Sequence, residues 1–145
     1  MFAQRTGRHA QRRVPAAVAM ILVGLFAASL ALARVTANTI DSVASVTDHG
    51  RHLIVTGPIG CTAGERAHLR VTVTQRTTGA VAEGRALINC TGSLQQWEVH
   101  ASVQGSETFE EGPAVATALS RTTDRGNTTD AHQWLVAITL EGRDQ

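Results

Sequence analysis

Apolar and polar residues alternate along most of the chain after residue 39, and this alternation is the strongest structural signal in the sequence. In its clearest run, Ala67, Leu69, Val71 and Val73 share one face, with histidine, arginine and threonine between them. A period of two residues is typical of a β-strand with one buried and one solvated face. The pattern predicts seven strands, at 39–47, 52–59 and 67–74, in a run ending at Cys90, and at 97–103, 109–122 and 132–140.

Turn residues separate these runs at nearly regular intervals. Gly57-Pro58 is expected to end or bend the second strand, because proline cannot donate to a ladder. The polar segment from Thr122 to Asp130 is expected to be a long exposed loop. The alanine-rich stretch 114–119 could also form a helix, but its threonine neighbours and the β context favour a strand. These features predict one all-β domain, built as an antiparallel sandwich of about seven strands.

The first 33 residues have the order of a secretory signal peptide. A basic head without acidic residues precedes an apolar run that ends in Ala31-Leu32-Ala33. Small residues at this spacing are the pattern that signal peptidase cuts. We therefore expect a signal-peptide helix at 1–33, cleavage before Arg34, and a secreted domain at 34–145 with its core at about 39–140. The alternative is a retained membrane anchor that leaves the domain facing outward.

The two cysteines, Cys61 and Cys90, bracket a predicted hairpin. In an exported chain two cysteines most often form one disulfide, so we expect a Cys61–Cys90 bridge. Cys90 follows Ala86 and Ile88 at a spacing of two residues, so on a strand all three share one face, and Cys90 is expected to point inward. A metal site would need closer cysteine spacing and a nearby third ligand.

Charge changes the picture once the leader is removed. The sequence has 13 strong bases, all arginine, and 12 acidic residues. Four arginines lie in the leader, so the predicted mature domain has 9 against 12, a net charge near −3. A nucleic-acid binder normally needs a basic face, so we do not expect that partner.

The segment from Thr39 to Leu140 resembles small secreted immunoglobulin-like sandwich proteins of Gram-positive, GC-rich bacteria. The resemblance lies in Gly60-Cys61-Thr62-Ala63-Gly64-Glu65, in Val71-Thr72-Val73-Thr74-Gln75, and in Cys90-Thr91-Gly92 followed by Trp97. It implies an immunoglobulin-like fold and export, without a defined activity. The chain is also similar in size to secreted subtilisin inhibitors and to apoproteins of the neocarzinostatin type. Those groups carry two disulfides, whereas this chain can form only one.

Candidate functional residues are few. Asp48, His49 and His52 surround one turn and could hold a metal, although such a turn is also typical of a solvated hairpin. Asp124, Arg125 and Asn127 offer hydrogen bonds from the predicted 122–130 loop, which could bind a partner or merely connect two strands. His68 and His100 fall on solvated faces by parity, and the two tryptophans fall on core faces.

No arrangement of catalytic residues emerges, so we expect no enzyme activity and no cofactor. The sequence favours an exported binding or structural module that acts as a monomer on an unknown extracellular protein or ligand. No stable membrane span is expected after cleavage. The alternatives are a small secreted metal-dependent hydrolase at the Asp48-His49-His52 turn, or a secreted protein similar to protease inhibitors.

Overall fold

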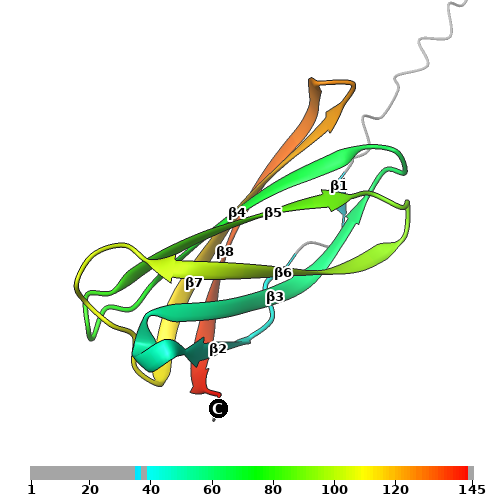
Figure 1. Cartoon of the computed structure of the whole chain (residues 1–145). Helices are drawn as coiled ribbons and strands as arrows, with labels where there is room; N and C mark the ends of the chain where they lie inside the picture. The colour runs from blue at the N-terminus through cyan, green and yellow to red at the C-terminus, as the bar shows by residue number, and fades with distance from the viewer. Residues whose placement is uncertain (1–34, 37–38, 144–145) are drawn as a thin grey trace, which may run out of the picture. The chain divides into compact units, whose positions relative to one another are not determined.

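The computed structural model describes residues 35–36 and 39–143, and the statements below concern these residues. Their elements, in chain order, are β1 (Val35–Thr36), β2 (Val43–Thr47), the 3-10 turn η1 (Asp48–Gly50), β3 (His52–Cys61), β4 (Arg66–Thr74), β5 (Val81–Asn89), β6 (Leu94–Val103), β7 (Gly112–Asp124) and β8 (Asn127–Gly142). The strands lie in the order β1-β3-β2-β8-β7-β4-β5-β6, and β3 also pairs with β6. This last pairing closes 7 of these strands, β2 to β8, into a barrel, and β1 pairs with β3 beside it (Figure 1).

The all-β prediction is confirmed, but the two packed sheets that we expected are one closed sheet. β6 pairs along its length with β3, from Leu94–Gly60 to Ser102–His52. The ladder between β2 and β8 is parallel, so the sheet is mixed rather than purely antiparallel. Alternation could not separate the two architectures, because the inner face of a barrel and that of a sandwich produce the same period of two.

The interior is filled by the predicted alternating residues. The residues at 67, 69, 71 and 73 of β4 are all buried, as are Trp97, Val99 and Ala101 of β6. Most of the core is valine, leucine, isoleucine and alanine, which a small barrel can pack without a cavity. In β8 only Ile138 and Leu140 are fully buried, whereas Trp134 is half-buried and His132 is exposed. Trp134 and Val136 nevertheless pack against the core, so the inward assignment of the last strand fails only at His132.

β3 continues past Gly57-Pro58 to Cys61, so the proline does not end the strand. Among the described residues, its second edge pairs with β2 only as far as Ile54 and with β1 only from Gly60. Proline is tolerated between these two ladders because no strand hydrogen bond is required there. Gly57 has a separate role: a Cβ at this position would lie 2.6 Å from the Trp97 ring, so the indole packs directly on the glycine backbone.

The expected 122–130 loop is a β-hairpin. β7 and β8 pair as far as Asp124–Asn127, and only Arg125 and Gly126 connect them. Both connecting residues have positive φ, +48° and +86°, as in the two-residue turns whose twist matches that of paired strands. Figure 1 shows this hairpin, in orange, extending past the neighbouring strands. Residues 124–128 at the end of the hairpin are all exposed, and their polarity alone does not distinguish a hairpin end from a loop.

The predicted Cys61–Cys90 disulfide is confirmed, with Cα atoms 5.3 Å apart, and both cysteines are buried. It joins the end of β3 to the residue after β5. β6 lies between these two strands in the sheet, yet its ladder with β5 consists only of Ala82–Val103 and Glu83–Ser102. The disulfide therefore supplies a covalent link where hydrogen-bonded pairing along this boundary has stopped.

The predicted leader and its cleavage residues, Ala31, Ala33 and Arg34, lie outside the described residues. Within the described ranges, no helix is long and apolar enough to cross a membrane.

Candidate binding face

The outward positions of four neighbouring strands form a regular grid. Because alternation buries the odd-numbered residues of β4, its even-numbered residues point to solvent, and the same holds for their partners on β5, β7 and β8. The register places Leu87, His68 and Arg121 in one row. The next row holds Arg85, Arg70, Leu119 and Gln133, and the third holds Glu83, Thr72, Thr117 and Leu135. We call this surface, together with Arg66, the arginine–leucine face.

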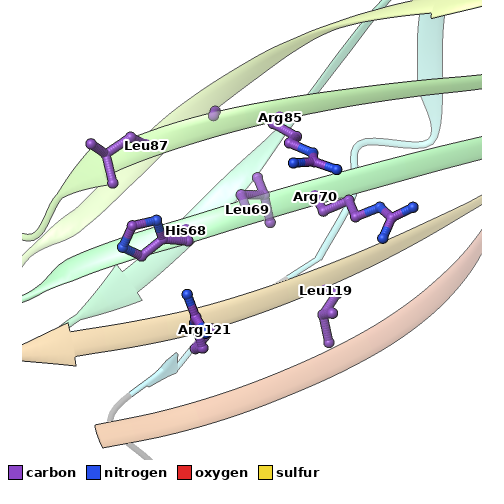
Figure 2. Close-up of a pocket in the computed structure, with 8 residues that line it drawn as sticks. His68, Leu69, Arg70, Arg85, Leu87, Leu119 and Arg121 are labelled. Atoms are coloured by element: carbon purple, nitrogen blue, oxygen red, sulfur yellow. The ribbon is translucent and has the colours of Figure 1, made fainter. Parts of the chain in front are cut away.

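A shallow groove with a volume of about 520 Å³ crosses the middle of this face. Figure 2 shows that its lining comes from three adjacent strands, with Leu87 and Arg85 on β5, His68 and Arg70 on β4, and Leu119 and Arg121 on β7. Within the region of the groove β4 and β7 pair on both sides, and β5 pairs with β4. A partner here would therefore meet side chains on a rigid support rather than a mobile loop.

Glu83 organises two of the arginines. Arg70 and Arg85 lie directly opposite each other across β4 and β5, an arrangement that is unfavourable for like charges. The carboxylate of Glu83 accepts a hydrogen bond from Nη2 of Arg70 at 2.5 Å and from Nη2 of Arg85 at 3.2 Å. The hydrogen bond from Arg70, aided by that from Arg85 and by both positive charges, lowers the pKa of Glu83 against an opposing effect of desolvation. One carboxylate thus fixes two guanidinium groups and leaves the trio with one net positive charge.

The remaining cations of the face are open to solvent. Arg66 and Arg121 are exposed, and neither makes a side-chain hydrogen bond or ion pair with another described residue. Nε2 of His68 lies 3.4 Å from the hydroxyl of Thr123, its one side-chain hydrogen bond within the described part of the chain. Three leucines are also exposed, Leu87 by 55%, Leu119 by 45% and Leu135 by 68%. The face therefore presents unpaired positive charge beside aliphatic surface, the combination that a protein-binding site offers.

A second groove continues the face toward the β7–β8 hairpin. It has a volume of about 810 Å³, and its lining includes Arg66, Arg121, Asp124 and Arg125. Two of the three residues expected to bind from a loop, Asp124 and Arg125, thus line a groove, but from the end of a tight hairpin. Asn127 begins β8 beside them. The sequence could identify these residues, but it could not show that they lie in one groove with Arg66 on β4 and Arg121 on β7.

The residues proposed for a metal site do not converge. Nδ1 of His49 is 3.9 Å from the carboxylate of Asp48, and the His49 side chain is fully exposed. His52 instead contacts His100 on β6, with 3.0 Å between Nε2 and Nδ1, and Nε2 of His100 lies 2.8 Å from Glu98. The part of the chain that the structure describes contains no cluster of three or more histidine, cysteine, aspartate or glutamate side chains placed to hold a metal ion.

The tryptophans occupy different environments. Trp97 is buried as predicted, and its indole N–H donates to the carbonyl of Pro58 at 3.3 Å. Trp134 is half-buried, and its indole nitrogen is buried with no hydrogen-bond partner among the described residues. The hydroxyl of Ser120, on the adjacent strand, is in the same state. Neither tryptophan is on the arginine–leucine face.

Sequence reasoning missed this face, although it correctly placed His68 in solvent. The alternation pattern could have indicated it. Arginine occupies the solvated positions 66, 70 and 85, and the leucines at 87, 119 and 135 also fall on the solvated side of the alternation. No protein-family model matches this chain, and no curated protein matches it at a significant level.

Proposed function

We propose that this chain is an exported, non-catalytic binding module whose arginine–leucine face contacts an extracellular partner. The leader pattern supports export, and a disulfide is compatible with an oxidising compartment. The module acts as a monomer and is stabilised by its closed sheet and disulfide.

One observation carries the proposal. The structure describes eight arginines, and five of them, Arg66, Arg70, Arg85, Arg121 and Arg125, lie on this face or its continuation toward the hairpin. They do so in a predicted mature domain whose net charge is negative. Such concentration of one charge, next to exposed leucines, costs free energy through repulsion and solvation of apolar surface. A partner that covers the face removes both costs.

Export is tested by the intact mass of protein recovered from culture medium. We expect the mass of 34–145 less two hydrogens for the disulfide. A full-length protein found only in a membrane fraction would contradict cleavage and leave the domain as an anchored module.

Contact at the face is tested by site-specific photo-crosslinking in the producing culture. A benzophenone amino acid placed at position 119 or 87 should yield the same adduct mass, because both sites line one groove. The matched control is position 94 on β6, where the leucine is 64% exposed but lies on a different part of the barrel. Adducts of equal yield at 94, or none at 87 and 119, would refute the proposed surface.

Neither alternative function gains support from a specific observation. A metal-dependent hydrolase at Asp48, His49 and His52 lacks the convergence that a catalytic metal needs. An inhibitor of the protease type needs an extended loop that fits a substrate cleft, whereas the protruding hairpin ends in a tight turn at Arg125-Gly126.

A further inference from the structure

We propose that the partner segment bound by the arginine–leucine face is an acidic peptide that carries aliphatic side chains. This inference rests on the proposed function and specifies its ligand. It follows from the placement of apolar and charged groups within the grid, which neither overall charge nor composition reveals.

The three exposed leucines lie on one diagonal. Leu87 is on β5 in the first row, Leu119 is on β7 in the second, and Leu135 is on β8 in the third. With about 4.8 Å between strands and about 6.8 Å for two residues along a strand, the steps measure about 12 Å and about 8 Å. The three leucines therefore form a stripe about 20 Å long that crosses the strands obliquely and passes between His68 and Arg70 on β4.

Positive charge lies on both sides of this stripe. Arg70 and Arg85 flank Leu119 on one side, held in place by Glu83, and Arg121 flanks it on the other. Guanidinium groups bind carboxylates through paired hydrogen bonds, and Arg121 has no competing partner among the described side chains. A segment with aliphatic residues along its centre and carboxylates at its margins matches this arrangement in both charge and polarity.

The other anionic partners fit less well. A nucleic acid or sulfated polysaccharide would leave the leucines exposed, and the groove offers a base only the small imidazole ring of His68, with no phenylalanine, tyrosine or tryptophan in its lining. A bilayer is flat, whereas the leucines at 87 and 119 line a groove on the face. The chain's own leader is basic and contains no acidic residue, so it cannot complement the face.

β4 and β7 are each paired on both sides, so strand addition is not available at the centre of the face. Recognition there must operate through side chains. We therefore expect binding to depend on both glutamate and leucine in the ligand, and to weaken as salt increases.

The test uses the mature, oxidised protein and three synthetic peptides of about fourteen residues, long enough to cover the stripe even as a helix. One combines glutamate with leucine, the second replaces leucine by serine, and the third replaces glutamate by glutamine. Heparin and anionic phospholipid vesicles are measured in parallel by titration. Only the glutamate–leucine peptide should saturate the protein below about 1 mM.

Two substitutions on the face are paired with two controls elsewhere. Arg121→Glu should weaken binding of the glutamate–leucine peptide by about tenfold or more, and Leu119→Ser by about tenfold. The controls are Arg76→Glu, in the turn after β4, and Leu94→Ser on β6, and each should change affinity by less than about twofold. Circular dichroism and intact mass check that each variant is folded and disulfide-bonded.

Several outcomes would overturn the inference. Equal affinity for the serine peptide would show that the leucine stripe has no role, and tighter binding of heparin or vesicles would assign the face to another polyanion or to lipid. Absence of binding to any probe would also reject the ligand class. Crosslinks at positions 87 and 119 would still stand in that case, so failure of the ligand class is distinguishable from failure of the proposed function.

Discussion

The barrel presents two outer surfaces with the same strand geometry and opposite chemistry. On β3 and β6, polar groups pair with one another: Asp41 accepts hydrogen bonds from Thr56 at 2.6 Å and Gln96 at 2.7 Å, and His100 links His52 to Glu98. On the arginine–leucine face, two arginines share Glu83, while Arg66, Arg121 and three leucines meet solvent. The polar groups named on the first surface satisfy one another, whereas Arg66 and Arg121 on the second have no side-chain partner among the described residues. Solvent exposure alone would not have distinguished them.

The largest expected effect comes from the link between the two surfaces. Replacing both Cys61 and Cys90 by serine should lower the free energy of unfolding by about 3.5 kcal/mol, because the bridge closes a loop with a sequence separation of 29. Urea unfolding measures the change, and wild-type protein under reducing conditions should behave like the double variant. A loss below about 1 kcal/mol would contradict the loop-closure explanation.

A smaller effect is expected where β5 crosses β6, at the border between the two surfaces. A Cβ at Gly84 would lie 2.4 Å from the carbonyl oxygen of His100 and 2.5 Å from Val99 Cγ1, so Gly84→Val should cost about 2 kcal/mol. Asn89→Val, at the exposed end of the same strand, is the control and should be nearly neutral. Equal stability of the two variants would show that β5 can move away from β6 freely.

The third prediction compares the surfaces directly. Asp41→Ala removes an acceptor shared by two donors on the self-paired surface and should cost about 1 kcal/mol. Arg121→Ala removes an exposed side chain that has no partner among the described side chains, and it should change stability by less than about 0.5 kcal/mol. Thermal or urea unfolding of both variants provides the measurement. The contrast fails if Arg121 proves as important for folding as Asp41.

The smallest effect is the pH dependence due to Glu83. Its folded-state pKa is lowered, so the unfolded chain binds its proton more readily, and the stabilisation is complete above the ordinary glutamate pKa and lost as pH falls through the lower folded value. The melting temperature of wild type should therefore exceed that of Glu83→Gln near neutral pH, and this gap should narrow below about pH 4.5.

A double-variant background isolates the cause of that dependence. When Arg70 and Arg85 are both replaced by glutamine, the further change of Glu83 to glutamine should no longer produce a gap that varies with pH. A gap of unchanged size and pH profile in this background would mean that the arginines do not set the pKa of Glu83.

The sequence predicts what depends on neighbouring residues in the chain. The inward residues of β4 and β6, the position of Cys90 and the strand character of the alanine-rich β7 all follow from alternation and propensity. Closure of the sheet does not, because it requires β3 to pair with a strand some forty residues away. The arginine–leucine face was not predicted for a similar reason: Leu87 and Arg70 lie on the predicted hairpin, but Leu119 becomes their neighbour only through the ladder between β4 and the distant strand β7.

The brief ladder between β5 and β6 has a consequence for how the folded protein fluctuates. Beyond Ala82 and Glu83, the backbone amides of β5 are protected by β4 alone, whereas those of β4 and β7 lie between two partners. Subglobal opening should therefore begin along this boundary, and hydrogen exchange in β5 and β6 should be faster than in β4 and β7. The disulfide limits the amplitude of that opening. The excess exchange of β5 and β6 should therefore be small while the disulfide is intact and should increase after reduction.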